Sequence, residues 1–173
     1  MVRAEQDADQ GAVRAVLTSA FGDRRVADLA DALRSGPARS ASVAVRDEQV
    51  IGQVMLSRGW VDAPERLVEV LVLSPLAVAP HQQRRSVGGA LVRAAIDAAA
   101  ALESPLLFLE GSPDYYSRFG FVPGSSRGFS GPSVRIPDAA FQVIVLPAWQ
   151  PSMTGALVYP EAFWEHDSVG LRS

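Results

Sequence analysis

The sequence contains no cysteine and no lysine, and it contains only two histidines. Without cysteine, the chain cannot form a disulfide framework, a thiolate metal site or an acyl-cysteine intermediate. All sixteen basic residues are arginine, which excludes Schiff-base chemistry on lysine and a lysine-containing P-loop. His81 and His166 are too few for a histidine-rich metal site. We therefore expect a protein without a metal ion.

A positive net charge and long apolar runs are also missing. The formal net charge of −3 argues against general nucleic-acid binding, which needs a basic surface. No apolar run reaches the roughly 18 residues of a membrane span, and the acidic N-terminal region does not resemble a secretory signal. We expect a cytoplasmic protein with no nucleic-acid or membrane partner. A length of 173 residues with 48% hydrophobic residues predicts one domain, residues 1–173, with a sizeable core.

Helical and strand periodicities alternate along the chain. Asp7 or Asp9 is expected to cap a first helix and Asp23 a second. The other predicted elements outside the central stretch are an edge strand in 1–5, a hairpin of 42–46 and 50–58, a polar turn over 60–66, a mobile Gly/Ser-rich loop over 124–132, and strands over 141–146 and 156–159.

The stretch from residue 71 to 121 carries the clearest pattern. The apolar run 71–78, ended by Pro80, predicts a strand buried on both faces, and 91–102 predicts an alanine-rich helix with one apolar stripe. Between them, 81–90 contains two arginines, two glycines and no acidic residue. Such a loop at a helix N-terminus favours anions, because free N–H groups and the positive end of the helix dipole converge there. Arginine also suits phosphate, so we expect a phosphorylated ligand.

Two motifs in this stretch resemble signatures of the GCN5-related N-acetyltransferases (GNAT). Gln83-Arg84-Arg85-Ser86-Val87-Gly88-Gly89-Ala90 resembles the family's Q/R-x-x-G-x-G/A pyrophosphate loop, and it follows an L-A-V-x-P strand end, Leu76-Ala77-Val78-Ala79-Pro80. Further on, Tyr115-Tyr116-Ser117-Arg118-Phe119-Gly120-Phe121 resembles the closing Y-x-x-x-G-F signature. The two motifs stand in the family's order, with a helix and a strand between them. The sequence around the second motif resembles that of a bacterial subgroup of small predicted N-acetyltransferases.

The resemblance extends over nearly the whole chain and implies an α/β (α+β) fold. In this GNAT fold, a mixed central sheet of about six to seven strands has helices on both faces and splayed central parallel strands. The implied cosubstrate is acetyl-CoA. The residues implied to bind it are Leu76, Ala77, Val78, Gln83, Arg84, Arg85, Ser86, Val87, Gly88, Gly89, Ala90 and Ser112.

The resemblance gives Tyr116 the role of proton donor to the departing thiolate, and Tyr115 is expected to pack in the core instead. The base that accepts the amine proton is Glu110 in our main hypothesis. Glu69 is an alternative, and each glutamate could instead be a solvated residue at a strand edge. His81 is expected on the outside of the loop. The implied reaction is transfer of an acetyl group to a primary amine of a small molecule or peptide, by direct attack in a ternary complex.

Ser86 departs from the family pattern, because the family commonly has the first loop glycine at this position. If the position needs a positive φ, serine would strain the loop. Alternatively, its backbone stays in an ordinary region and its hydroxyl helps to hold phosphate. A second hypothesis is therefore a catalytically inactive module that binds CoA or acyl-CoA. A third is a structural protein that uses its aromatic C-terminal region for contacts. The sequence leaves open the acceptor and the oligomeric state, a homodimer included.

Overall fold

The computed structural model describes residues 1–171, and the chain forms two compact units. Unit 1 comprises Met1–Ser57 and Leu73–Ala98, and unit 2 comprises Arg58–Val72 and the chain from Ala99 onward. Strands β3 (Gln49–Asp62) and β4 (Leu67–Val78) run through both units. The expectation of a single domain over residues 1–173 stays a prediction.

The remaining elements follow in chain order. They are β1 (Val2–Ala4), α1 (Gln10–Phe21), α2 (Arg25–Arg34), β2 (Ala38–Arg46), α3 (Val87–Ala101), β5 (Leu106–Glu110), α4 (Pro113–Tyr116), β6 (Val122–Pro123), β7 (Phe141–Val145), β8 (Ala156–Val158) and α5 (Glu161–Glu165). Five short 3-10 helices join them: Asp7–Asp9, Pro80–Gln82, Ser117–Phe119, Gly124–Arg127 and Asp138–Ala140.

The described strands form one mixed eight-stranded sheet in the order β1-β2-β3-β4-β5-β7-β6, with β8 paired to β3. Strands β4 and β5 are parallel neighbours, and their pairing joins Leu71 to Leu107 and Val72 to Phe108. The predicted mixed sheet with helices is therefore confirmed. The extra strand is β6, which the sequence did not reveal because two residues, one of them proline, show no periodicity.

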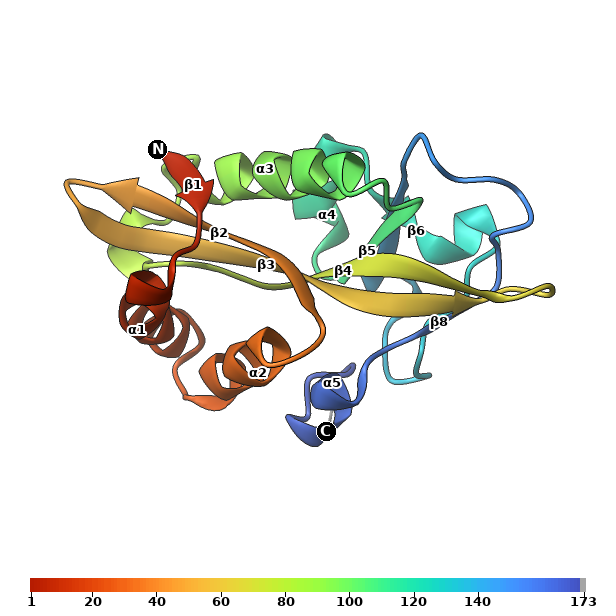
Figure 1. The fold of residues 1–173 in the computed structure, drawn as a ribbon, viewed down its shortest axis with the longest axis horizontal. Helices are drawn as coiled ribbons and strands as arrows, with labels where there is room; N and C mark the ends of the chain where they lie inside the picture. The colour runs from red at the N-terminus through yellow and green to blue at the C-terminus, as the bar shows by residue number, and fades with distance from the viewer. Residues whose placement is uncertain (172–173) are drawn as a thin grey trace. The chain divides into compact units, whose positions relative to one another are not determined.

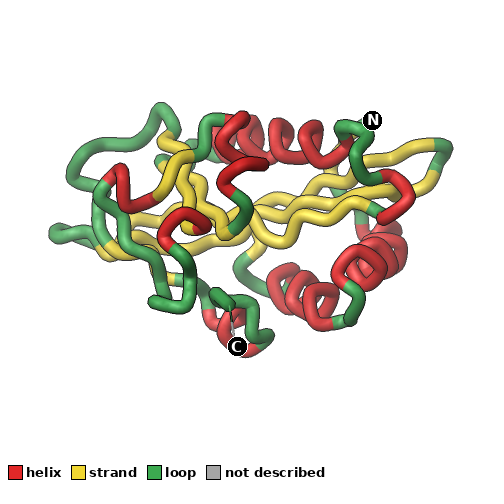
Figure 2. The backbone as a smooth tube through the Cα atoms, turned by 180° about the vertical axis from the view of Figure 1, so that it is seen from behind, coloured by secondary structure: helices red, strands yellow, loops and turns green. Residues whose placement is uncertain are grey.

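In unit 1, helices cover both faces of the sheet. Figure 1 shows α1 and α2 below the strands and α3 above them, and the view from behind in Figure 2 agrees. Arg14 joins the two lower helices through Asp28 and Asp31, at 2.5 and 2.6 Å. Asp23 accepts the backbone N–H of Arg25, the first residue of α2, at 2.8 Å. It lies one residue before the N-cap position, which Arg24 occupies.

The prediction that Asp7 or Asp9 caps the first helix is wrong. Asp9 stands at the N-cap position of α1 without a capping hydrogen bond from its side chain. Its carboxylate instead accepts two hydrogen bonds from Arg3, at 2.7 and 2.9 Å, and one from the backbone N–H of Gln6 at 2.8 Å. The arginine from β1 competes successfully for the carboxylate because a charged bidentate pair is stronger than a neutral cap.

The first turns of α3 pack closely on β3 at Gly52. A Cβ atom added to Gly52 would lie 2.9 Å from Leu91 Cδ1, 3.0 Å from the carbonyl oxygen of Ala77 and 3.4 Å from Val87 Cγ1. The missing side chain therefore lets the helix rest directly on the strand. Val87 and Leu91 are both buried, so the start of α3 belongs to the core of unit 1.

In unit 2, the packing corrects two expectations from the sequence. Residues 60–66 were expected to form a turn, yet β3 continues to Asp62, and Trp60 and Val61 pair with Val158 and Leu157 of β8. The sequence hid this strand end because Pro64 and its charged neighbours dominate the local composition. Trp60, Val61 and Asp62 nevertheless alternate in burial as strand residues do.

The second correction concerns residues 124–132, expected to be an irregular loop. The segment begins with a 3-10 helix over Gly124–Arg127, and Ser130 bridges to Ala156. Phe129 is buried, with its ring 5.2 Å from that of Phe108. One aromatic side chain thus fixes a segment whose glycine and serine content suggested little structure.

Candidate active site

Polar contacts hold the first part of the loop between β4 and α3. The side chain of Gln83 donates to the carbonyl oxygen of Val78 at 3.1 Å, and Arg46 of β2 donates to the side chain of Gln82 at 2.6 Å. At the end of β4, the N–H of Ala79 donates to Ile51 of β3 at 2.8 Å. The backbone entering the loop is therefore held by contacts with β2 and β3.

Helix α3 begins with open backbone donors. At its start, the N–H of Ala90 donates to the carbonyl oxygen of Ser86 at 3.1 Å. The N–H groups of Val87, Gly88 and Gly89 belong to the first turn, where a helix supplies no acceptor. Arg84, Arg85 and Ser86 are exposed just before this turn. Such an arrangement can bind an anion through backbone N–H groups, the helix dipole and guanidinium groups.

Two residues of the loop have a left-handed backbone. Arg84 has a φ of 61° and Ser86 a φ of 63°, a region that L-residues other than Asn and Asp rarely adopt. The position of Ser86 therefore does need a positive φ, and serine strains it. Such outliers persist only where the surrounding structure enforces them, and they are concentrated at functional sites.

Replacing Ser86 by glycine should raise the free energy of unfolding by about 0.5–1 kcal/mol. A left-handed backbone costs an L-residue other than glycine about 1–2 kcal/mol, and Ser86→Gly removes this cost. Part of the stabilisation is offset, because glycine loses more backbone entropy than serine on folding. Urea denaturation of the wild type and Ser86→Gly measures the difference. Ser86→Val should change stability in the opposite direction, and equal stability of all three proteins would contradict the strain.

The residues Leu76, Ala77 and Val78 form the end of β4. Ala77 is buried, whereas Leu76 and Val78 are half-buried. The run 71–78 is thus less completely buried than a strand covered on both faces would be. The side chain of Gln83 uses one of the two lone pairs on the Val78 carbonyl oxygen, which leaves that oxygen able to accept another donor.

In unit 2, Tyr116 packs against the backbone that follows β5. A Cβ atom added to Gly111 would lie 2.5 Å from Cε2 and 3.0 Å from Cδ2 of Tyr116. The backbone of Gly111 is itself held by Ala140 and by the buried amide of Gln142, each at 3.0 Å. Glycine at position 111 thus allows the tyrosine ring to lie directly on a backbone fixed from both sides.

Burial, together with the neighbouring Tyr115, raises the pKa of Tyr116 to about 12. The hydroxyl therefore stays protonated at neutral pH, as a proton donor must. The other tyrosine, Tyr115, is half-buried and has the guanidinium of Arg118 4.4 Å from its ring centre. Its ring also lies 4.8 Å from that of Tyr116, so its contacts are packing contacts.

The two candidate bases have different surroundings. Glu69 of β4 is exposed. Glu110, the last residue of β5, is half-buried and accepts hydrogen bonds from the N–H of Gly170 and from Tyr159. Burial is the main influence on Glu110 and raises the pKa of its carboxyl, while Gly170, Tyr159 and Arg135 act in the opposite direction. Burial and a perturbed pKa thus distinguish Glu110 from the exposed Glu69 as a candidate functional group.

The comparisons with known proteins agree with this geometry. A family model described as an acetyltransferase (GNAT) domain matches residues 1–124. The uncharacterized N-acetyltransferase YjhQ of Escherichia coli K12 is 35% identical over 132 residues, which cover 72% of this chain and 71% of YjhQ. The chain belongs to the GNAT family. It is accordingly an acyltransferase.

Two solved GNAT structures resemble the chain over most of its length. The N-acetyltransferase YhbS of Escherichia coli, solved in complex with CoA, has a TM-score of 0.84 and 28% identity, covering 94% of this chain and 91% of YhbS. A GNAT acetyltransferase of Brucella melitensis, solved in complex with acetyl-CoA, has a TM-score of 0.76 and 26% identity, covering 94% and 97% of the two chains.

Within this GNAT chain, the predicted site residues fall into two groups. The first, from Leu76 to Ala90, lies in unit 1 at the end of β4 and the start of α3. The second lies in unit 2, where Glu110, Ser112 and Tyr116 follow one another from the end of β5 into α4. Ser112 is exposed at the N-cap position of α4, but its side chain makes no capping bond.

Sequence reasoning missed the partners of Glu110. Tyr159 and Gly170 follow Glu110 by about fifty and sixty residues, and no local spacing connects them to β5. In the sequence, Tyr159 stands out only as one aromatic residue of the C-terminal region. The GNAT motifs could not reveal these partners, because both motifs end at Phe121 or earlier.

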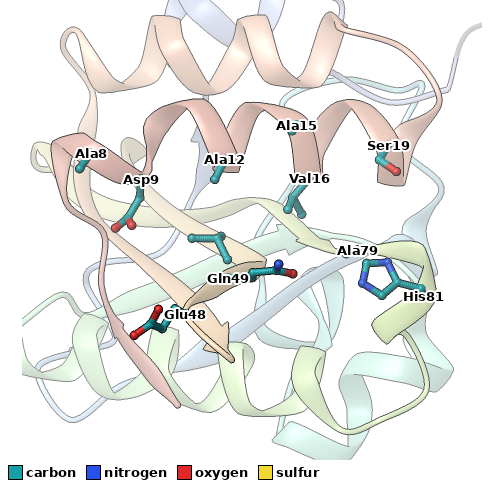
Figure 3. Close-up of a pocket in the computed structure, with 11 residues that line it drawn as sticks. Ala8, Asp9, Ala12, Ala15, Val16, Ser19, Glu48, Gln49, Ala79 and His81 are labelled. Carbon is teal, nitrogen blue, oxygen red and sulfur yellow. The ribbon is translucent and has the colours of Figure 1, made fainter.

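A cavity of about 570 Å³ opens in unit 1 between α1 and the start of β3. In Figure 3, small side chains of α1 such as Ala12 and Ala15 face Glu48 and Gln49, with His81 on another side. His81 is exposed, as expected. The cavity contains none of the residues predicted to bind acetyl-CoA or to take part in catalysis.

The described residues include no group of three or more histidine, aspartate or glutamate side chains arranged to hold a metal ion. Among the helices of residues 1–171, none combines the length and the apolar character that crossing a membrane requires.

Proposed function

We propose that this chain transfers the acetyl group of acetyl-CoA to a primary amine of a small molecule or peptide. The observation that carries the proposal is the loop from Gln83 to Ala90, with two arginines and N–H groups of the first turn at the start of a helix that is buried on one face. CoA contains a pyrophosphate, which matches those donors. The CoA and acetyl-CoA complexes of the two similar GNAT proteins support the same ligand.

The reaction proposed is direct attack in a ternary complex. The nitrogen of a neutral amine attacks the thioester carbonyl, a tetrahedral intermediate forms, and the carbon–sulfur bond then breaks. Glu110, directly or through a water molecule, accepts the proton that the amine loses, and Tyr116 gives a proton to the departing thiolate. Neither step needs a cysteine, which the chain lacks.

The residues proposed to bind the cofactor hold it in place by contacts with its pantetheine arm and its phosphates. The backbone of Leu76 to Val78 is proposed to hold the pantetheine arm, and the loop with Arg84 and Arg85 to hold the phosphates. Ser112, exposed beside Tyr116's helix, is proposed to donate a hydrogen bond to the cofactor. We also propose that residues 1–173 act as one domain, because β3 and β4 pass continuously through both compact units.

Calorimetric titration with acetyl-CoA and with its 3′-dephospho analogue tests the proposal. We expect micromolar binding of acetyl-CoA and weaker binding of the analogue, followed by release of free thiol when an amine panel is added. An absence of binding to acetyl-CoA would exclude the proposed activity.

The alternative of an inactive CoA-binding module has one structural observation in its favour. The Glu110 carboxylate is already engaged by Gly170 and Tyr159, and such contacts could be purely structural. The module would bind acetyl-CoA equally well but release no thiol with any amine. Thiol release with a single amine would exclude it.

A further inference from the structure

Two donors from the C-terminal region reach the carboxylate of Glu110. The backbone N–H of Gly170 lies 3.2 Å from Oε1 and 3.4 Å from Oε2 of Glu110. The hydroxyl of Tyr159, just after β8, donates to the same carboxylate. Tyr159 is only 5% exposed, so this hydrogen bond is protected from water. Two far segments of the chain thus meet at the end of β5.

The segment that carries Gly170 is itself fixed by several contacts. Arg135 donates to the carbonyl oxygen of Val169 at 3.1 Å, and the N–H of Leu171 donates to the carbonyl oxygen of Arg135 at 3.2 Å. The side chain of Val169 is 1% exposed. The N–H of Gly170 is therefore presented to Glu110 by a segment packed on both sides of it.

Only glycine fits at position 170. Its φ is +66°, and an added Cβ atom would lie 2.7 to 2.9 Å from Arg135, including the carbonyl carbon and oxygen of that residue. Real Cβ atoms are not found so close to backbone atoms, so a larger side chain would displace the segment. The N–H that reaches Glu110 thus depends on the absence of a side chain.

We propose that Tyr159 and the backbone N–H of Gly170 are positioning groups that hold the Glu110 carboxylate, as an anion in one orientation, for the acceptor amine. This proposal rests on the proposed function, in which Glu110 accepts the amine proton. An ionised carboxylate has about four lone-pair sites. Two donors fix the group and still leave sites for an ammonium or a water molecule. Tyr159 acts through Glu110 and does not touch the reacting atoms.

The groups around Glu110 determine in which direction its pKa should change when a donor is removed. Burial raises the pKa of the carboxyl, while the N–H of Gly170, the hydroxyl of Tyr159 and the charge of Arg135 each lower it. Among the residues that the structure describes, these are the groups that shift the pKa of Glu110. The pKa of Tyr159 itself lies well above its ordinary value, mainly through burial, so its hydroxyl remains a donor throughout the working range. Removing either donor should therefore raise the pKa of Glu110 further.

A purely structural role for the same contacts predicts something different. If Glu110 only fixed the C-terminal segment, loss of the Tyr159 hydroxyl would lower the melting temperature and leave the pH dependence of the reaction unchanged. The pH at which activity is half-maximal on the acidic side therefore distinguishes a positioning role from a structural one.

The experiment compares pH profiles of kcat/KM for the wild type, Tyr159→Phe and Trp149→Phe, measured by thiol release at saturating acetyl-CoA. Trp149→Phe is the matched control, because it also removes one aromatic donor, from a 3.2 Å hydrogen bond to Met153. We expect the acidic limb of Tyr159→Phe to move upward by about one pH unit. The limb of the control should coincide with that of the wild type. An unmoved limb in Tyr159→Phe would overturn the proposal.

A second variant keeps the test valid if Tyr159→Phe folds poorly. Gly170→Ala should displace the N–H donor and move the acidic limb in the same direction. Its control is Gly11→Ala in α1, where an added Cβ atom meets nothing within 4 Å. Coincident profiles for Gly170→Ala and the wild type would also contradict the proposal.

A measurement without turnover separates the two hypotheses. The pKa of Glu110 is read from the pH titration of its carboxyl carbon by nuclear magnetic resonance, in the wild type and in both variants. A higher pKa in the variants shows that both donors hold the ionised carboxylate even if no amine is acetylated, in which case only the proposed function fails. An unchanged pKa removes the positioning role even if acetyl transfer is observed.

Discussion

Replacing Tyr116 by phenylalanine should lower kcat by about 100-fold or more, with the Kd for acetyl-CoA unchanged. General acid catalysis typically contributes about 10²- to 10⁴-fold, and phenylalanine keeps the ring that packs on Gly111 while removing the proton. Because the pKa of Tyr116 is raised to about 12, its hydroxyl stays protonated over the usual assay range. The rate should therefore fall by the same factor at every pH from 6 to 9. Stopped turnover assays measure kcat, and calorimetry measures the Kd for acetyl-CoA.

Tyr115→Phe is the control for this experiment. Tyr115 lies next to Tyr116 in α4, but its ring is packed against Arg118 and the ring of Tyr116. Removal of its hydroxyl should change kcat by less than about twofold. Equal turnover by Tyr116→Phe and the wild type would remove Tyr116 from the chemistry, and the proton for the thiolate would then have to come from water.

Replacing Arg84 and Arg85 together by glutamine should raise the Kd for acetyl-CoA by about 100-fold. Hydrogen bonds to charged groups contribute about 1.5–3 kcal/mol each, and about 1.4 kcal/mol corresponds to a factor of ten in Kd. Glutamine keeps much of the side-chain length, so the change tests charge more than packing. Both arginines are exposed, and the fold should therefore be little affected.

The matched control removes an arginine from α3 itself, outside the loop. Arg93 of α3 is also exposed, and Arg93→Gln should leave the Kd within about twofold of the wild type. A salt titration adds a second criterion, because screening weakens charge contacts at exposed sites. Binding by the double variant should depend less on salt than binding by the wild type. Equal affinity of the double variant and the wild type would show that the backbone alone holds the phosphates.

The sequence predicted most of the fold because the long elements have clear periodicities. Hydrophobic spacing was sufficient to find three of them. The strands of 71–78 and 106–109 are continuous apolar runs, and the alanine-rich helix between them has one apolar stripe. Short elements were not predicted, because they are too short to show a periodicity. The two residues of β6 have no period, and the end of β3 at Trp60 owes its structure to pairing with β8.

The candidate site likewise has one part that the sequence predicted and one part that it did not. Gln83 to Ala90 could be found because a phosphate loop is local in sequence, and even the strain at Ser86 followed from its position in the motif. The surroundings of Glu110 could not be found. They depend on Tyr159 and Gly170, which reach the carboxylate only through packing of the C-terminal region. Local chemistry is visible in a sequence, whereas contacts between distant segments are not.

The close packing at Gly52 has a consequence for the thermodynamics of ligand binding. Since Val87 and Leu91 lie against β3 with no room for a methyl group between them, the first turn of α3 is already ordered before a ligand arrives. Fixing flexible backbone costs about 1–2 kcal/mol per residue at room temperature. In this protein that entropy loss is confined to the few exposed residues between Gln83 and Ser86. The helix amides are preorganised, so most of their interaction with a phosphate would appear as affinity.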